Sequence, residues 1–197
     1  MSFFKDARQI PADSLLQLIA DFRNDPSPNK IDLGVGVYQD DSGRTPIFSA
    51  VATAQQRLLQ IEDTKSYLGP LGWPGFDNDL KQLVLGEQLN SQIGARVASL
   101  PTPGSSGALK SAGTLVKRIN PEARIWLSRP SWANHRPIFI SCGFEPLDYT
   151  YYDQEAAGID RSRMYEDLAE VRAGDVVVVH GCCHNPTGAD FVAEDWA

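Results

Sequence analysis

The fold is decided by Asp175-Val-Val-Val-Val-His-Gly-Cys-Cys-His-Asn-Pro-Thr-Gly188, where an apolar run gives way to a turn rich in glycine and proline. The β-branched residues after Asp175 predict a buried strand. Ligands of open α/β sheets bind beyond the carboxyl ends of the strands, so Asn185-Pro-Thr-Gly188 falls where a ligand is expected. Pro186 fixes its own φ and restricts Asn185, which holds that amide in place. The sequence leaves open whether the Asn185–Pro186 bond is cis or trans.

Working outward, helical and extended patterns alternate along the chain. Extended patterns are predicted at 95–100, 124–128, 145–152 and 176–179. Helical patterns are predicted at 13–24, 49–61, 76–89, 104–119, 133–142 and 160–169, with Asp13 and Ser49 as expected caps. Such alternation predicts an α/β fold with a mostly parallel sheet flanked by helices. A composition shift near residues 40–50 predicts a boundary between a small N-terminal segment, 1–45, and a large domain, 46–197.

Composition narrows the classes of partner. The formal net charge is -7 over 197 residues, which argues against nucleic acid or an anionic membrane as a partner. No apolar run approaches the length of a membrane span, and the first ten residues lack the apolar core of a secretion signal. The three cysteines favour a reduced, cytoplasmic setting.

His180, Cys182, Cys183 and His184 are candidate metal ligands, because thiolates and imidazoles bind zinc. Adjacent cysteines point to opposite faces of an extended chain, and no second cluster completes a ligand set. We therefore predict that the chain holds no metal and that both cysteines pack in the core.

The turn Pro103-Gly-Ser-Ser-Gly107 lies between a predicted strand and a predicted helix. Glycines allow backbone N–H groups to approach an anion, and the start of the helix adds unpaired donors and a partial positive charge. The spacing is neither that of a P-loop nor that of a full dinucleotide fingerprint. From these residues alone, a phosphate site and an ordinary turn both remain open.

Two aromatic residues follow the predicted strand 124–128. Trp132 offers a flat surface for a cofactor ring, although its position alone favours a core or interface tryptophan. His135 lies three residues further on and is, taken alone, consistent with a structural histidine.

Five motifs together resemble one family. They are Leu33-Gly-Val-Gly-Val-Tyr38, Thr64-Lys-Ser-Tyr-Leu-Gly69, Thr102-Pro-Gly-Ser-Ser-Gly-Ala-Leu109, Pro130-Ser-Trp-Ala-Asn-His135 and His180-Gly-Cys-Cys-His-Asn-Pro-Thr-Gly188. In this order and spacing they resemble the aspartate/aromatic branch of the class I aminotransferases, enzymes that use pyridoxal 5'-phosphate (PLP). The resemblance runs from near residue 11 to the end of the chain and covers about the N-terminal half of a family subunit.

The resemblance implies the PLP-dependent transferase fold type I. Residues 1–45 would then be an N-terminal arm with part of the small domain, and 46–197 the first, incomplete part of the PLP-binding domain. Phe191–Ala197 reads as the start of a helix without a stop signal, so a truncated chain is expected. The family forms homodimers with shared active sites, so we also expect a homodimer.

The resemblance also implies roles for individual residues. Cofactor-binding positions are Gly104, Ser105, Ser106, Trp132, Asn185, Tyr67 and His135. The first three match the phosphate-binding turn, in which the family often has Gly-Thr at the two serines. Trp132 matches the residue that stacks on the pyridine ring, and Asn185 the donor to the 3′ oxygen. His135 matches the support of the pyridine nitrogen's carboxylate partner, and Tyr67 reaches the partner subunit's cofactor phosphate.

Substrate-binding positions implied by the family are Gly36, Trp132, Asn185, Leu15, Leu16 and Val35. Their substrates would be an amino acid and a 2-oxo acid, with aspartate and aromatic substrates both left open. The family's Schiff-base lysine lies in its C-terminal half, and no lysine here matches it. We therefore expect an aminotransferase parent and an inactive 197-residue chain.

Three other functions remain open at the level of sequence. One is a non-catalytic remnant that binds a partner, and another is a different fold-type I PLP enzyme such as a lyase or decarboxylase. The third is a nucleotide-binding Rossmann module, which would need a fuller glycine fingerprint and an acidic residue after its second strand.

Overall fold

The computed structural model describes residues 14–32, 34 and 36–196. The chain divides into two compact units, 1–66 and 67–197, which are treated separately below. The predicted domain boundary at residue 45 stays a prediction. Among the described residues, no helix has both the length and the apolar character needed to cross a membrane.

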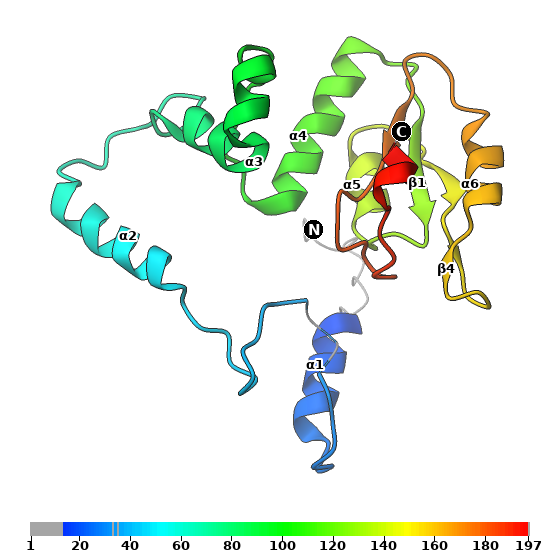
Figure 1. Cartoon of the computed structure of the whole chain (residues 1–197), viewed down its shortest axis with the longest axis horizontal. Coiled ribbons are helices and arrows are strands. Elements are labelled where there is room, and N and C mark those ends of the chain that lie inside the picture. Colours follow the sequence, from blue (N-terminus) through cyan, green and yellow to red (C-terminus); the bar gives the residue numbers. More distant parts are fainter. Residues whose placement is uncertain (1–13, 33, 35, 197) are drawn as a thin grey trace, which may run out of the picture. The chain divides into compact units, whose positions relative to one another are not determined.

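The first unit holds helices α1 (Ser14–Asn24) and α2 (Ser49–Ile61), both at predicted positions (Figure 1). Ser49 was expected to cap the second helix, but the N-cap is Phe48, which has no side-chain capping bond. A turn follows Asp40, whose carboxylate accepts the backbone N–H groups of Ser42 and Arg44. The cap at Asp13 lies outside the described residues.

The second unit follows the predicted alternation of helices and strands. Its helices are α3 (Phe76–Ile93), η1 (Gly94–Arg96), α4 (Gly104–Ile119), α5 (His135–Ser141), α6 (Arg161–Leu168) and η2 (Ala193–Trp196). Its strands are β1 (Ile125–Arg129), β2 (Leu147–Thr150), β3 (Tyr152–Asp153), β4 (Gly158–Ile159) and β5 (Val176–Val178). Strands β2, β1 and β5 form a parallel sheet in that order, and β3 pairs antiparallel with β4. The α/β prediction is confirmed.

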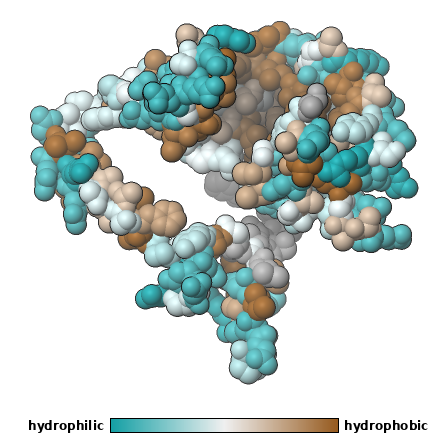
Figure 2. Space-filling view, in the orientation of Figure 1, coloured by the Kyte–Doolittle hydropathy of each residue, from teal (hydrophilic) through white to brown (hydrophobic). Residues whose placement is uncertain are grey.

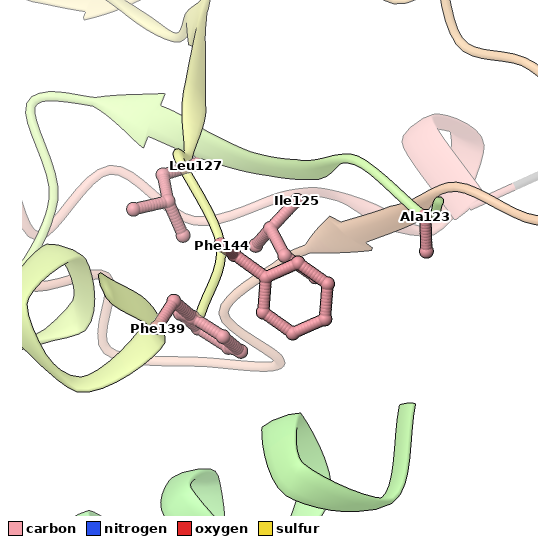
Figure 3. Close-up of a cluster of buried hydrophobic side chains, with 5 residues drawn as sticks. All are labelled: Ala123, Ile125, Leu127, Phe139 and Phe144. Carbon is pink, nitrogen blue, oxygen red and sulfur yellow. The ribbon is translucent and has the colours of Figure 1, made fainter. Parts of the chain in front are cut away.

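Strand β1 is the centre of this sheet and is covered on both faces, as its apolar sequence requires. On one face, Ile125 and Leu127 contact Phe139 of α5 and the following Phe144 (Figure 3). On the other face, Trp126 packs with a cluster made by Tyr149, Tyr151 and Met164. Residues 125, 126 and 127 are at most 4% exposed, so β1 anchors two hydrophobic clusters.

A carboxylate at the start of β5 ties that strand to β1. Asp175 accepts bonds from the backbone N–H and the guanidinium of Arg124 and from the backbone N–H of Arg172. The indole of Trp126 lies 3.4 Å from the same carboxylate. The hydrogen bond from the Arg124 side chain is the main reason that the pKa of Asp175 lies well below its ordinary value of 3.8. Burial acts in the opposite direction, and the backbone donors lower the pKa further.

We expect Asp175→Asn to destabilise the chain near neutral pH. A depressed folded-state pKa stabilises the fold above the ordinary carboxyl pKa, and this contribution is lost as pH falls through the folded-state value. The urea midpoints of wild type and variant should therefore differ most near neutral pH, and the difference should narrow as the pH falls below 3.8. As a control, Asp148→Asn removes an exposed ion pair with Arg136 and should change the midpoint little. A pH-independent gap between wild type and Asp175→Asn would contradict the assignment.

The strand predicted at 95–100 is wrong. A strand needs a ladder partner, and no described segment pairs with these residues. Their backbone groups bond to α3 instead: Ser99 N–H donates to Asp77 at 2.5 Å, and Lys81 donates to the carbonyl of Val97 at 2.9 Å. Likewise, the helix expected from Phe191 is only the short 3₁₀ turn η2.

Large apolar side chains also remain on the surface, as the brown areas in Figure 2 show. On α3 and α4 they include Leu83, Val84, Leu115 and Ile119, each more than half exposed. The core of the second unit is therefore built around β1, while its outer helices stay partly uncovered.

Candidate functional site at the carboxyl edge of the sheet

The three parallel strands end at one edge of the sheet, so the segments that follow them meet there. Ser131 and Trp132 follow β1, Tyr151 follows β2, and the turn 180–188 follows β5. The structure resolves the open question of the proline turn, because both Asn185–Pro186 and Arg129–Pro130 are cis.

Rings from these three segments form a continuous aromatic array. Trp132 and His135 meet edge-on with centroids 5.3 Å apart, and His135 meets His180 in the same way at 5.2 Å. His180 stacks on His184 at 4.1 Å, and His184 stacks on Tyr151 at 4.0 Å. Trp132 thus lies at one end of the array, Tyr151 lies at the other end, and three histidines lie between them.

A chain of hydrogen bonds assigns the tautomers of two histidines. The backbone N–H of Asn185 donates to Nδ1 of His180 at 3.0 Å, so the proton of that neutral ring is on Nε2. Nε2 lies 3.5 Å from Oγ of Ser131, and that hydroxyl lies 2.7 Å from Nδ1 of His135. With the Ser131 hydroxyl donating to Nδ1, His135 carries its proton on Nε2 and can donate it to a neighbouring acceptor.

Burial keeps these rings neutral. Desolvation lowers the pKa of both His135 and His184, and the neighbouring His180 lowers both values further. The pKa of His184 falls to about 4. Its ring is 2% exposed and is held by the hydroxyls of Ser128 at 3.1 Å and Thr187 at 2.9 Å. His184 is therefore a fixed, uncharged support for the edge.

The turn before Asn185 is clamped by a carboxylate. The two oxygens of Asp190 accept the backbone N–H groups of Cys183 and His184, each at 2.7 Å. These bonds lower the pKa of Asp190, so the carboxylate stays charged. The backbone of Asn185 is held by His180, while its side chain is exposed and can donate to a ligand.

A second set of donors lies at the start of α4. Gly104 has φ +69, a conformation that suits glycine, and the helix begins there without a side-chain cap. Ser105 and Ser106 are exposed, and no acidic residue lies in the first turn. The first N–H groups of the helix and these hydroxyls are therefore available to an anion, which fits a phosphate.

The structure places the predicted site residues in several separate parts of the chain. The aromatic array at the carboxyl edge of the sheet, called the edge array below, contains Trp132 and His135. Asn185 adjoins it through the bond from its backbone N–H to His180. Gly104, Ser105 and Ser106 form the start of α4. Tyr67 is fully exposed at the start of the second unit. Gly36 is exposed in the first unit. Val35 and the side chains of Leu15 and Leu16 lie outside the described residues.

From the sequence, Ser131 and Asp190 were not identified as parts of the site, and His180 and His184 were identified only as candidate metal ligands. Their usable signal was position: each follows a strand that ends at the same edge. Among the described residues, no group of three or more His, Cys, Asp or Glu is arranged to hold a metal ion.

The prediction that the paired cysteines pack in the core is wrong. Cys182 and Cys183 are both exposed, and Cys183 has φ +53. The chain is therefore not extended at Cys183, and the alternation of side chains assumed for an extended segment does not apply.

Known proteins resemble the chain over almost all of its length. The family described as aminotransferase class I and II matches residues 28–197. The aromatic-amino-acid aminotransferase of Paracoccus denitrificans is 45% identical over 185 residues, which cover 94% of this chain and 46% of that protein. The aspartate aminotransferase of Escherichia coli K12 is 42% identical over 98% of this chain and 49% of its own length.

A solved structure agrees with the fold. The aromatic-amino-acid aminotransferase of Burkholderia pseudomallei, described as covalently bound to pyridoxal phosphate, superposes with a TM-score of 0.92 at 36% identity. The match covers 100% of this chain and 49% of that one. The chain thus spans about half the length of the relatives it matches.

Proposed function

The chain belongs to the class I and II aminotransferases, in their aspartate and aromatic branch, and from this we propose that it supplies half of a PLP-dependent aminotransferase subunit. Its partners in the reaction would be an amino acid and a 2-oxo acid. The observation that carries the proposal is the edge array, in which an exposed Asn185 amide lies in the same turn that fixes the His135 tautomer.

The residues present fit the cofactor. The uncapped start of α4 and the hydroxyls of Ser105 and Ser106 would bind the phosphate. Trp132 would cover the ring face, and the Asn185 amide would donate to the phenolic oxygen. His135 would donate its Nε2 proton to a carboxylate that faces the ring nitrogen. When bound, PLP supplies the electron sink that allows a proton to leave the substrate α-carbon.

The lysine for covalent attachment is not among the five that the structure describes. Each of their amines bonds to another group: Lys30, Lys65, Lys81, Lys110 and Lys117 contact Phe22, Glu62, Val97, Ser141 and Pro121, respectively. Catalysis needs such an amine to hold the cofactor and move the proton. We propose that this chain is inactive without further sequence that supplies the amine.

Assembly and location follow from the same proposal. Tyr67 is fully exposed, which suits a side chain that reaches the cofactor phosphate of a second subunit in a homodimer. Gly36, Leu15, Leu16 and Val35 would contact the substrate. Three free cysteines support a reduced, cytoplasmic setting.

The decisive experiment is the denatured intact mass of the native protein after borohydride reduction with PLP. A chain about twice this length that carries one phosphopyridoxyl group would support the aminotransferase, as domain sizes of this fold allow. A chain that ends at Ala197 without an adduct would refute catalysis by this polypeptide and leave a phosphate-binding remnant.

Phosphate binding by the chain itself can be tested with Ser106→Ala. Loss of one hydrogen bond to a charged group should weaken binding of PLP by about 10- to 100-fold. Binding of pyridoxal, which has no phosphate, should not change. Ser111→Ala is the matched control, because Ser111 is an exposed serine further along the same helix. Equal losses for PLP and pyridoxal, measured by fluorescence titration, would exclude Ser106 from a phosphate site.

A further inference from the structure

The turn that follows β5 carries an exposed pair of adjacent thiols, Cys182 and Cys183, that the proposed function does not use. Cys183 has a left-handed backbone, with φ +53, which is uncommon for a residue that is not glycine. The alternation that points neighbouring side chains to opposite faces of a strand therefore does not apply at Cys183.

Both thiols are free and exposed on adjacent residues of the turn. The neighbouring Cys182 side chain is the largest cause that raises the pKa of the Cys183 thiol, and the charge on Asp190 acts in the same direction. Cys142, the third free cysteine, follows α5 and contacts Lys110 and Thr114 of α4. Cys142 therefore packs against α4 and not in the turn after β5, so Cys182 and Cys183 are the two cysteines that can form a disulfide with each other.

We propose that Cys182 and Cys183 form a reversible dithiol site that reacts with small-molecule disulfides of the glutathione type. One thiol loses its proton and attacks the small disulfide, which gives a mixed disulfide and releases one thiolate. The second thiol, once deprotonated, attacks the mixed disulfide, closes the Cys182–Cys183 bond and releases the other thiolate. The protein pair is oxidised, the small disulfide is reduced to two thiols, and the two protons pass to the released thiolates.

The product should be easy to reduce again. The Cα atoms of adjacent residues lie about 3.8 Å apart across a trans peptide, closer than the roughly 4.4–6.8 Å of ordinary disulfides. Such strain, together with exposure, makes a disulfide labile. The site therefore suits a reversible modification rather than a structural crosslink.

Ring closure should also reach the neighbouring turn. Starting from the left-handed turn, bond formation still requires a small adjustment of the torsions at Cys182 and Cys183, and the present torsions direct the Cys183 N–H to Asp190. The same carboxylate holds His184. We expect oxidation to weaken this clamp, so the amide of Cys183 should exchange its hydrogen faster in the oxidised chain.

The test is to incubate the reduced protein with glutathione disulfide, alkylate it with iodoacetamide, digest it with trypsin and determine the mass of the tryptic peptide that begins at Ala173. We expect this peptide to be two hydrogens lighter than its reduced form, with no alkyl group, and to regain both thiols with dithiothreitol. A doubly alkylated peptide, a lasting glutathione adduct or a disulfide to another peptide would overturn the proposal.

Two variants and one condition sharpen the test. Cys142→Ser should still close the ring, whereas Cys183→Ser should stop at the glutathione adduct on Cys182. In denaturant, where Cys183 rarely visits the left-handed conformation, closure should be about tenfold slower. Equal rates in the folded and unfolded chain would show that the turn does not organise the pair.

Discussion

Replacement of Ile125 by alanine is expected to destabilise the second unit by about 2–5 kcal/mol, the usual cost of such a truncation in a packed core. Ile125 is 0% exposed and lies on the central strand, against Phe139 and Phe144 (Figure 3). Truncation leaves a cavity that neighbours on two different elements must fill or tolerate. Because the sheet has only three strands among the described residues, no further strand shares the loss.

Urea denaturation followed by tryptophan fluorescence measures this effect, since Trp126 lies on the same strand. The matched control is Ile140→Ala, which makes the same chemical change at a residue that is 54% exposed on α5. The control should lie within about 0.5 kcal/mol of the wild type. Equal losses at both positions would mean that Ile125 does not occupy a packed core.

Replacement of His184 by alanine is expected to cost about 2–4 kcal/mol, because the buried hydroxyl of Ser128 and the hydroxyl of Thr187 lose a partner and two ring contacts disappear. As a control, Asn134→Ala changes an exposed polar residue that makes no side-chain capping bond, and it should have little effect. A loss at His184 no larger than at Asn134 would mean that the array does not support the edge.

The same histidine should make stability depend on pH. The folded-state pKa of His184, about 4, lies below the ordinary value of 6.5. Between these two pH values the His184 ring is protonated in the unfolded chain but neutral in the folded chain. Stability should therefore rise with pH across this window, and His135 and His180 act in the same direction. The slope of the unfolding free energy between pH 4 and 6.5 should be smaller in His184→Ala. An unchanged slope would assign the dependence to other groups.

Local pattern predicted the elements whose signals are local. Gly104–Ile119 matches its helix at both ends, because a glycine begins it and its apolar residues recur at helical spacing. The strands β1 and β5 are apolar runs, and both were located correctly. Residues 95–100 also have strand character, but a strand exists only with a partner, and these residues bond to α3 instead.

Two features of the site escaped the sequence for a similar reason. Ser131 and His180 are separated by 49 residues and meet only because β1 and β5 pair in parallel with a defined register. The orientation of the cysteine pair depends on the positive φ of Cys183, which the assumption of an extended chain did not anticipate.

The sequence by itself determined the alternation of helices and strands, the placement of Asn185 and Trp132 after strands, and the family to which the chain belongs. These depend on side-chain size, polarity and the backbone preferences of glycine and proline, which act over a few residues. Only the tertiary structure decided that His135 and His184 are the buried histidines, which ring nitrogen of His135 carries the proton and why the pKa of His184 falls. Desolvation and hydrogen-bond polarity arise from groups brought together across the sheet, so no local stretch of sequence contains them.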